Sequence, residues 1–122
     1  MSGGEERLLG MWGEGQVAEY LRKQGWKIVA ANYRSRFGEI DLIAENGRFL
    51  AFVEVKLRKS SRFAQARAFV TAEKQRKLRM TAELYLAENK TGLQPRFDVA
   101  EVYAPQGRNT KDPVIHYIEN AF

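Results

Sequence analysis

The segment Glu39-Ile-Asp-Leu-Ile-Ala-Glu-Asn-Gly-Arg-Phe-Leu-Ala-Phe-Val-Glu-Val-Lys-Leu-Arg58 decides the fold. Its two apolar runs, residues 39–45 and 48–58, are rich in aliphatic and aromatic residues, which is typical of strands. Asn46-Gly47 lies between the runs and is a strong hairpin signal, because Asn and Gly both accept positive φ angles. We therefore expect an antiparallel hairpin closed by a two-residue turn.

Charged residues interrupt both predicted strands. Side chains alternate between the faces of a strand, so Glu54 and Lys56 share one face. A two-residue turn would place Asp41 opposite Phe52 and Glu39 opposite Glu54, and opposed residues share a face. Asp41 is then expected on the face of Glu54 and Lys56, one pair away from Glu54.

This grouping of carboxylates is difficult to explain by packing. Carboxylates brought together on a half-buried sheet repel each other and lose hydration, and a divalent cation removes both costs. Mg²⁺ favours a few carboxylates together with waters and phosphate oxygens, so Asp41 and Glu54 are candidate ligands. Lys56 would orient a water or stabilise charge at a scissile phosphate. An ordinary ion pair of Lys56 with either carboxylate, contributing about 0–1 kcal/mol, stays open as the alternative.

Glu14 is a further candidate ligand. It lies close to the apolar stripe of a predicted helix, three residues from Met11 and from Val17. A carboxylate that points toward the sheet would complete the cluster. An ordinary exposed helix glutamate is the open alternative.

The rest of the chain predicts one mixed α/β domain over residues 1–122, because this length suits a single domain. Apolar periodicity gives the order α-β-β-β-α-β-β with a central sheet. The other elements are a helix over 8–21, a strand over 26–33, a helix from the cap Thr71 to about 89, and strands over 96–103 and 114–118. Residues 60–70 are expected to form a basic loop. Asp98 is expected to pair with an arginine and to hold two strands.

Composition excludes several kinds of site. The chain has no cysteine and a single histidine, His116. Disulfide scaffolds, thiolate zinc sites, iron–sulfur clusters and cysteine nucleophiles are therefore excluded, as is a His-rich metal site. No apolar run approaches the roughly 20 residues that span a bilayer, and the N-terminus lacks the features of a signal peptide. We expect a cytoplasmic protein without a membrane partner.

Positive charge is concentrated in one block. Nine basic residues and one acid lie between Lys56 and Arg79, whereas the rest of the chain has 11 basic and 14 acidic residues. Such a block is a plausible footprint for a polyanion, and a solvated loop and helix face is the open alternative. The candidate phosphate contacts are Arg58, Lys59, Arg62, Lys74 and Lys77 from this block, together with Arg34.

Several motifs together resemble the YraN family of small bacterial proteins, which are similar to archaeal Holliday-junction resolvases. The motifs are Gly13-Glu14 with Val17-Ala18 and Tyr20-Leu21, Asn32-Tyr33-Arg34, Gly38-Glu39-Ile40-Asp41-Leu42-Ile43, Phe52-Val53-Glu54-Val55-Lys56 with Arg58, Lys74-Gln75 with Leu78, and Arg96-Phe97-Asp98-Val99. The resemblance extends over about residues 9–103, and the combination is specific although a short Glu-x-Lys string is not.

The resemblance implies a restriction-endonuclease-like fold of the PD-(D/E)XK class. It implies that Asp41 and Glu54 bind Mg²⁺ or Mn²⁺, that Lys56 assists the hydrolytic water, and that Glu14 is the helix carboxylate of the resolvase branch. Gln75 or Lys77 lies where some members place a further polar residue. Two features depart from the pattern: Ile40 precedes Asp41 where the class name has proline, and residues 60–70 contain no glycine or proline.

The expected function is therefore a Mg²⁺- or Mn²⁺-dependent endonuclease acting on DNA, with branched or damaged DNA as candidate substrates and RNA not excluded. Related resolvases act as two-fold dimers, so a homodimer is implied by the resemblance. A non-catalytic nucleic-acid-binding module with the same fold is the second hypothesis. An adaptor whose basic face docks an acidic protein is the third.

Overall fold

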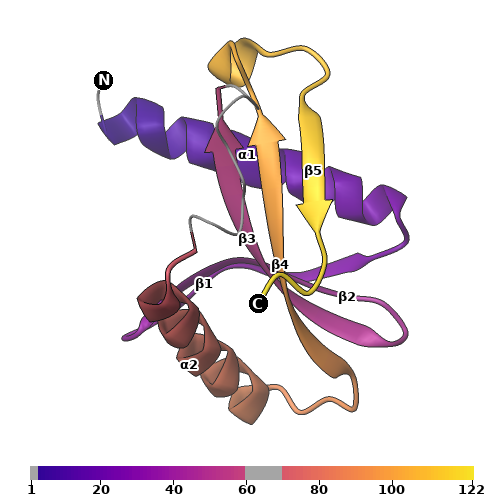
Figure 1. Ribbon diagram of the computed structural model, residues 1–122. Coiled ribbons are helices and arrows are strands. Elements are labelled where there is room, and N and C mark those ends of the chain that lie inside the picture. Colours follow the sequence, from indigo (N-terminus) through magenta and orange to yellow (C-terminus); the bar gives the residue numbers. More distant parts are fainter. Residues whose placement is uncertain (1–2, 60–69) are drawn as a thin grey trace.

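One five-stranded sheet lies between two helices in the computed structural model, which describes residues 3–59 and 70–122 (Figure 1). The elements are α1 (Gly3–Lys23), β1 (Lys27–Ser35), β2 (Gly38–Glu45), β3 (Phe49–Arg58), α2 (Ala72–Glu88), β4 (Gln94–Tyr103), the short 3-10 helix η2 (Gly107–Asn109) and β5 (Val114–Ile118). This confirms the predicted order α-β-β-β-α-β-β. The predicted loop over 60–70 lies, except for Val70, outside the described residues.

The sheet is mixed, with strand order β1-β2-β3-β4-β5. Neighbouring strands are antiparallel except β3 and β4, which run parallel. A parallel pair needs a crossover connection, and α2 lies in the connection between β3 and β4. The arrangement is consistent with a restriction-endonuclease-like fold. Within the described ranges, neither long helix is apolar enough to cross a membrane.

The two faces of the sheet support separate apolar clusters. On one face, Val17 and Leu21 of α1 pack with Leu42, Ala51 and Val53. On the other face, α2 packs against the sheet through a second set of apolar residues that includes Leu78, Ala82, Ile43, Phe52 and Val99. Residues of one strand divide between the clusters because successive side chains point to opposite faces.

Helix α1 runs without interruption through Gly13, although a glycine weakens a helix interior. A Cβ atom at Gly13 would lie 2.9 Å from Cδ2 of Leu57, so α1 and β3 approach closely at this point. Glycine therefore serves packing here, and its helix-weakening effect is outweighed by tertiary contact. The neighbouring Glu14 is brought near the sheet by the same approach.

The β2–β3 hairpin differs from its predicted register. Glu45 pairs with Leu50, so the loop has four residues, and the expected two-residue turn at Asn46-Gly47 is wrong. The Asn46 side chain explains the difference, since its Oδ1 accepts hydrogen bonds from the backbone N–H groups of Arg48 and Phe49. The pairing moves by two residues, and an even shift keeps every side chain on its expected face. Asp41 now lies toward Glu54 and not toward Phe52.

The sheet divides where β2 and β3 separate. Their ladder ends at the pair Leu42–Val53; beyond it, residues 38–40 pair with β1 and residues 54–58 pair with β4. In Figure 1, β1 and β2 turn aside from β3 and β4 toward α2. We call this point the fork. At the fork the backbone N–H of Val55 donates to Oδ2 of Asp41 at 2.8 Å. The Asp41 carboxyl thus accepts the hydrogen bond that a backbone carbonyl of a neighbouring strand would otherwise accept.

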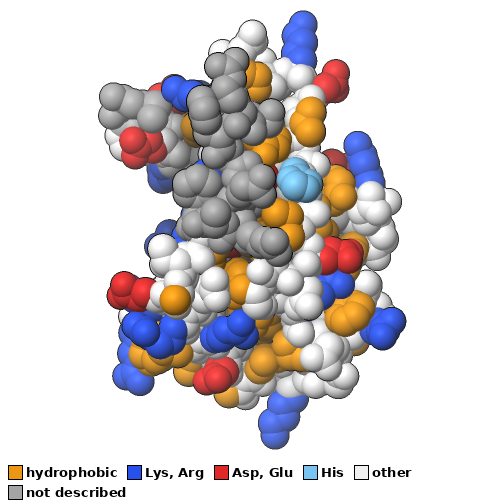
Figure 2. Space-filling view, in the orientation of Figure 1, with side chains coloured by type: hydrophobic (Ala, Val, Ile, Leu, Met, Phe, Trp, Pro, Cys, Tyr) orange, Lys and Arg blue, Asp and Glu red, His pale blue; other side chains and the backbone are white. Residues whose placement is uncertain are grey.

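The described part of the basic block does not form one uniform surface. Figure 2 shows basic side chains over the region of α2, interleaved with acidic and apolar ones. Within α2, Lys74 is directed to Glu54, Lys77 pairs with Glu73, and the Arg79 guanidinium lies over the Phe97 ring. The charges of this helix therefore point to different parts of the molecule.

Candidate functional site

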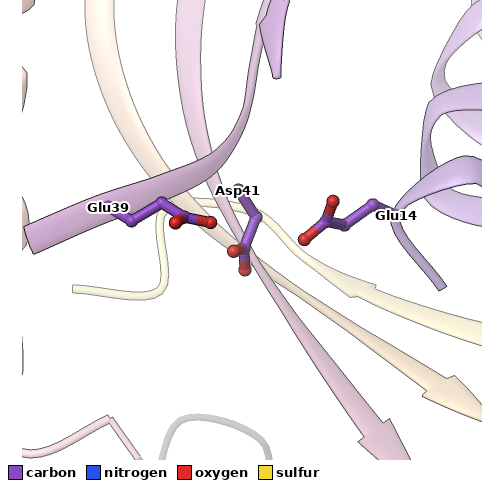
Figure 3. A group of neighbouring side chains, drawn as sticks. All are labelled: Glu14, Glu39 and Asp41. Atoms are coloured by element: carbon purple, nitrogen blue, oxygen red, sulfur yellow. The ribbon is translucent and has the colours of Figure 1, made fainter. Parts of the chain in front are cut away.

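Three carboxylates meet at the fork. Glu14 comes from α1, and Glu39 and Asp41 come from β2; one oxygen atom of each lies within 4.8 Å of the others. Figure 3 shows the three side chains directed toward one another. We call them the carboxylate trio. Glu14 and Asp41 were predicted members, whereas Glu39 had been considered only as a neighbour of Glu54.

Two side chains of β1 donate hydrogen bonds to Glu14 and Glu39 of the trio. The Asn32 amide donates to Glu14 Oε1 and to Glu39 Oε1, each at 3.0 Å. The Arg34 guanidinium donates to the other oxygen of Glu39 at 2.9 Å. Arg34, a predicted phosphate contact, therefore lies beside the site and engages one of its carboxylates.

Asp41 carries the electrostatic cost of the cluster. Burial, the hydrogen bond to Glu54 and the negative charge of Glu54 raise the pKa of Asp41 to about 8. Burial and the charges of Glu39 and Glu54 also raise the pKa of Glu14, against the hydrogen bond from Asn32, which lowers it. At neutral pH, Asp41 keeps its proton and donates a hydrogen bond to Glu54, because an anionic Asp41 would face other carboxylates.

Glu54 lies on the other side of Asp41, in contact with two lysines. The side chain is 5% exposed, and Nζ of Lys56 lies 3.4 Å from its Oε2, which Lys74 of α2 also contacts. Burial alone would raise the pKa of Glu54, but hydrogen bonds from Asp41 and Lys74 and both lysine charges lower it. Burial and the nearby Lys74 lower the pKa of Lys56, against the attraction of Glu54. Lys56 is therefore an ammonium group that loses its proton more readily than an exposed lysine.

These residues fit a hard divalent cation. Mg²⁺ and Mn²⁺ prefer oxygen ligands, and the fork offers the carboxylates of Glu14, Glu39, Asp41 and Glu54. The trio is crowded, and burial and the neighbouring carboxylates raise the pKa of Asp41; a cation bound here would relieve both effects. An opening reaches this place from outside: a pocket of about 290 Å³ lies between the start of β2 and the first turns of α2, and its lining includes Glu39 and Lys74.

The other predicted phosphate contacts are distributed around the fork. Lys59 is exposed directly after β3. The Arg58 side chain is 19% exposed and donates to the buried Glu101. Lys77 lines the pocket, while Gln75 donates to the backbone carbonyl of Val70. Arg62 lies outside the described residues.

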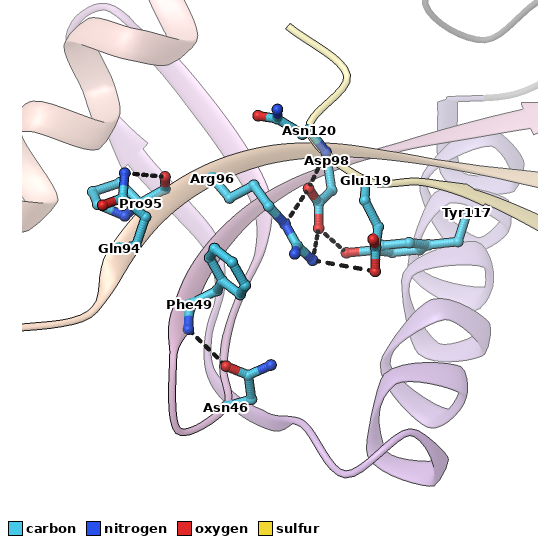
Figure 4. Close-up of polar contacts among 9 residues, drawn as sticks. All are labelled: Asn46, Phe49, Gln94, Pro95, Arg96, Asp98, Tyr117, Glu119 and Asn120. Atoms are coloured by element: carbon cyan, nitrogen blue, oxygen red, sulfur yellow. Dashed lines mark hydrogen bonds and ion pairs between the residues drawn. The ribbon is translucent and has the colours of Figure 1, made fainter.

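Asp98 has a different environment on β4, where it pairs with Val53 of β3 (Figure 4). It is fully buried and accepts two hydrogen bonds from Arg96, at 2.9 and 3.0 Å. The Tyr117 hydroxyl and the Asn120 backbone N–H also donate to it. The expected arginine partner is confirmed, and the additional donors join β4 to β5 and to the turn that follows it.

Sequence reasoning missed three contacts at the fork. The first is the contact of Glu39 with Asp41 and Glu14. Alternation already placed Glu39 on the face of Asp41, so the sequence did indicate that these two side chains lie close together. Nothing in the sequence indicated that Asn32 adopts a φ of 53°, which lets its amide reach two carboxylates. The contact of Lys74 with Glu54 depends on how α2 docks, which a local pattern does not encode.

Comparison with known proteins gives one consistent result. The pattern that defines the Uncharacterised protein family UPF0102 matches residues 13–102, a range that contains every described residue of the fork. A UPF0102 protein of Symbiobacterium thermophilum is 47% identical over 120 residues, which is 95% of this chain and 97% of the relative. A UPF0102 protein of Alkaliphilus metalliredigens is 42% identical to this chain over 117 residues, and one of Nocardia farcinica is 41% identical to this chain over 120 residues.

These matches span nearly whole chains, with 95% of this chain and 98% of the Alkaliphilus relative aligned, and 98% of this chain and 92% of the Nocardia relative. The family match also contains the motifs from Gly13 to Val99 that carried the resemblance. The chain therefore belongs to the family UPF0102, which is the YraN family.

Proposed function

We propose that this protein is a metal-dependent endonuclease that hydrolyses phosphodiester bonds in DNA, with branched or damaged DNA as its substrate class. One observation carries the proposal: the fork gathers the trio Glu14, Glu39 and Asp41, and beside it the pair of Glu54 with Lys56, whose Nζ lies 3.4 Å from Glu54 Oε2. The description of the family names no activity, so the proposal depends on these residues. The cytoplasmic location expected from the sequence is part of the same proposal.

The carboxylates would hold Mg²⁺ or Mn²⁺. Asp41 lies between Glu54 and the other two members of the trio, so it is the central ligand, and Glu14 and Glu39 approach from α1 and from β2. Asp41 must release its proton for this role. A divalent cation bound here would supply positive charge to the scissile phosphate and lower the pKa of a bound water.

Lys56 would act on the water. As an ammonium group it would orient a water through Nζ; its lowered pKa eases the loss of a proton to solvent, which would have to come before it accepts one from that water. Glu54 fixes Lys56 by the 3.4 Å ion pair. Lys74 adds a second positive charge at the same place, where it would stabilise the negative charge that develops on the phosphate.

The surrounding cations would bind phosphates without reading sequence. Arg34, Lys59 and Lys77 lie around the opening of the fork or at the end of β3, and such contacts position a nucleic acid rather than specify its bases. Binding should therefore weaken as salt rises, because phosphate contacts release counterions.

A cleavage assay tests the proposal. Four-way junction, linear duplex and single-stranded DNA, with RNA for comparison, are incubated with Mg²⁺, Mn²⁺ or EDTA. We expect metal-dependent cutting that is lost, by about 10²–10⁴-fold, in Glu54→Gln and in Lys56→Ala. Glu19→Gln is the matched control, since Glu19 is an exposed glutamate of α1. A folded wild-type protein that cuts none of these substrates with either metal contradicts the proposal.

One observation favours a second candidate function. Lys56 and Lys74 both contact Glu54, so two protein cations already occupy the surroundings of this carboxylate. A non-catalytic nucleic-acid-binding module would need no cation there. It predicts salt-sensitive binding to junction DNA that Glu54→Gln leaves unchanged, together with no cleavage by any form of the protein.

Cleavage of a four-way junction would also call for a homodimer, because such a junction presents two symmetric strands. Sedimentation of the protein with and without junction DNA measures this directly. A complex with two protein chains per junction is expected. A stable complex with one chain per junction would argue against a resolvase role and leave single-site cleavage as the proposal.

A further inference from the structure

Asn32 has an unusual backbone at the centre of the fork. Its φ is 53°, which lies in the left-handed region that few residues other than Gly, Asn and Asp adopt readily. The pairs Ala31–Leu42 and Tyr33–Ile40 flank it, so Asn32 stands opposite Asp41 while the regular pairing omits both residues. β1 is therefore distorted at the position that faces the central carboxylate.

The distortion directs the Asn32 amide toward two carboxylates from different elements. Nδ2 donates to Glu14 of α1 and to Glu39 of β2, each at 3.0 Å. Ionised carboxylates only accept hydrogen bonds, so the amino end of the amide must face them, and its two N–H groups match the two acceptors. This one side chain connects α1 to β2 at the carboxylate trio.

A neutral donor suits a cation site better than a charged one. Lysine at this position would hold Glu14 and Glu39 together but would also neutralise them, and it would compete with an incoming metal ion. The Asn32 amide brings the two carboxylates together and adds no positive charge beyond that of Arg34, which pairs with Glu39. Asn32 is exposed, so it contributes little to the apolar packing of the fold.

We propose that Asn32 is a positioning residue for the metal site: through its left-handed backbone and its two hydrogen bonds it sets Glu14 and Glu39 beside Asp41. The inference rests on the proposed function, because it assumes that these carboxylates bind a divalent cation. It gives the Asn32-Tyr33-Arg34 motif a role in the site, since Arg34 holds the second oxygen of Glu39. Hydrogen-bond partners of metal ligands are usually needed for full metal affinity.

The test compares two identical substitutions. Asn32→Gly removes the amide and keeps the positive φ available, because glycine adopts it without strain. Asn120→Gly is the matched control: Asn120 has a φ of 52°, is exposed, and contacts Asp98 through its backbone N–H, which glycine retains. Mn²⁺ affinity is measured by calorimetry and by the electron paramagnetic resonance signal of bound Mn²⁺, and melting temperature is measured in EDTA.

We expect Asn32→Gly to bind Mn²⁺ about 10–100-fold more weakly than the wild type, while Asn120→Gly binds within about two-fold of it. The melting temperature of Asn32→Gly in EDTA should stay within about 5 °C of the wild-type value. Equal Mn²⁺ affinity in Asn32→Gly and the wild type overturns the inference. So does failure of Asn32→Gly to fold, or a larger loss of melting temperature, because the two hydrogen bonds would then support the fold.

The outcome also separates this inference from the function beneath it. Wild-type protein that binds no Mn²⁺ at millimolar concentration removes the metal site and, with it, both proposals. Wild-type protein that binds Mn²⁺ and cuts DNA, with an unchanged Asn32→Gly variant, leaves the proposed function standing and removes the role of Asn32 alone.

Discussion

Asp98 and Asp41 are two inward-facing carboxyl groups with different neighbours. Asp98 is fully buried and receives hydrogen bonds from Arg96, Tyr117 and Asn120 (Figure 4). Asp41 at the fork receives one backbone N–H and otherwise faces Glu54, together with the carboxylates of Glu14 and Glu39 that Figure 3 shows beside it. The first carboxylate is satisfied by donors of the protein itself, whereas the second is paired with acids. Asp98 thus marks a structural joint between β4 and β5, whereas the acids around Asp41 mark a candidate functional site.

The largest expected effect comes from removing the charge of Asp98. Asp98→Asn should lower the free energy of unfolding by about 3 kcal/mol, because the Arg96 guanidinium, whose side chain is 10% exposed, would keep only the exposed Glu119 as a charged partner. Chemical denaturation at neutral pH measures this change. Asp112→Asn, at an exposed position, is the control and should change stability by less than about 0.5 kcal/mol. An equally small effect at position 98 would remove the contrast between the two sites.

The same substitution at the fork should change the free energy of unfolding in the opposite direction. Asn at position 41 can still accept from the Val55 N–H and donate to Glu54, but it needs no proton to do so. Asp41→Asn should therefore raise the free energy of unfolding at pH 7.5 in EDTA, by about 1–2 kcal/mol. Denaturation of Asp41→Asn beside Asp98→Asn tests both signs in one experiment. Destabilisation by Asp41→Asn would mean that the Asp41 charge is already compensated within the apo protein.

The pH dependence of the wild type follows from the raised pKa of Asp41. The folded protein holds a proton on Asp41 up to a pKa of about 8, whereas an unfolded aspartate loses it near its ordinary pKa of 3.8. The stabilising effect of this proton is complete below the unfolded pKa and is lost as pH rises through the folded one. Between about pH 6 and pH 8 in EDTA, the Asp41 contribution should fall by on the order of 1 kcal/mol.

Denaturation midpoints across this range measure that change. Asp41→Asn is the comparison, since it should remove most of the decline, and saturating Mn²⁺ should reduce it because metal binding replaces the proton. A wild type and an Asp41→Asn variant with identical pH profiles would contradict the raised pKa.

The smallest effect is expected from one donor of the Asp98 network. Tyr117→Phe removes the hydroxyl that donates to Asp98 but keeps the ring that stacks on Tyr20. Since Arg96 and Asn120 continue to donate to Asp98, the loss should be about 0.5–1.5 kcal/mol. Thermal and chemical denaturation measure it. A loss as large as that of Asp98→Asn would mean that the network acts as a unit rather than as separate bonds.

The fold was largely predictable because local and tertiary signals agree. The apolar runs gave all five strands, and Thr71 caps α2 as predicted by accepting a hydrogen bond from the Lys74 backbone N–H. The hairpin register was not predictable from Asn46-Gly47, because the Asn46 side chain bonds the backbone of its own loop and lengthens it. The predicted face of each side chain was still correct, because the register differs from the predicted one by an even number of residues.

The site was only partly accessible from the sequence. Alternation brought Asp41, Glu54 and Lys56 to one face, and the structure places all three at the fork. Glu39 enters the trio and Lys74 contacts Glu54 through the separation of β2 from β3 and the docking of α2. The shared face of Glu39 and Asp41 follows from alternation within β2, but the strand separation and the docking of α2 are tertiary events that no single segment of sequence encodes.

The fork has a consequence for how copies of this protein avoid one another. Once β2 leaves, residues 54–58 of β3 have a strand neighbour on one side, β4, among the described residues. An open strand edge invites pairing with another chain and thereby aggregation, which natural proteins counter with charged side chains. Lys56 and Arg58 belong to this stretch, and a strand from another chain that paired here would have to bury their ion pairs with Glu54 and Glu101. The residues proposed to serve phosphate chemistry would thus also act as gatekeepers against edge-to-edge association.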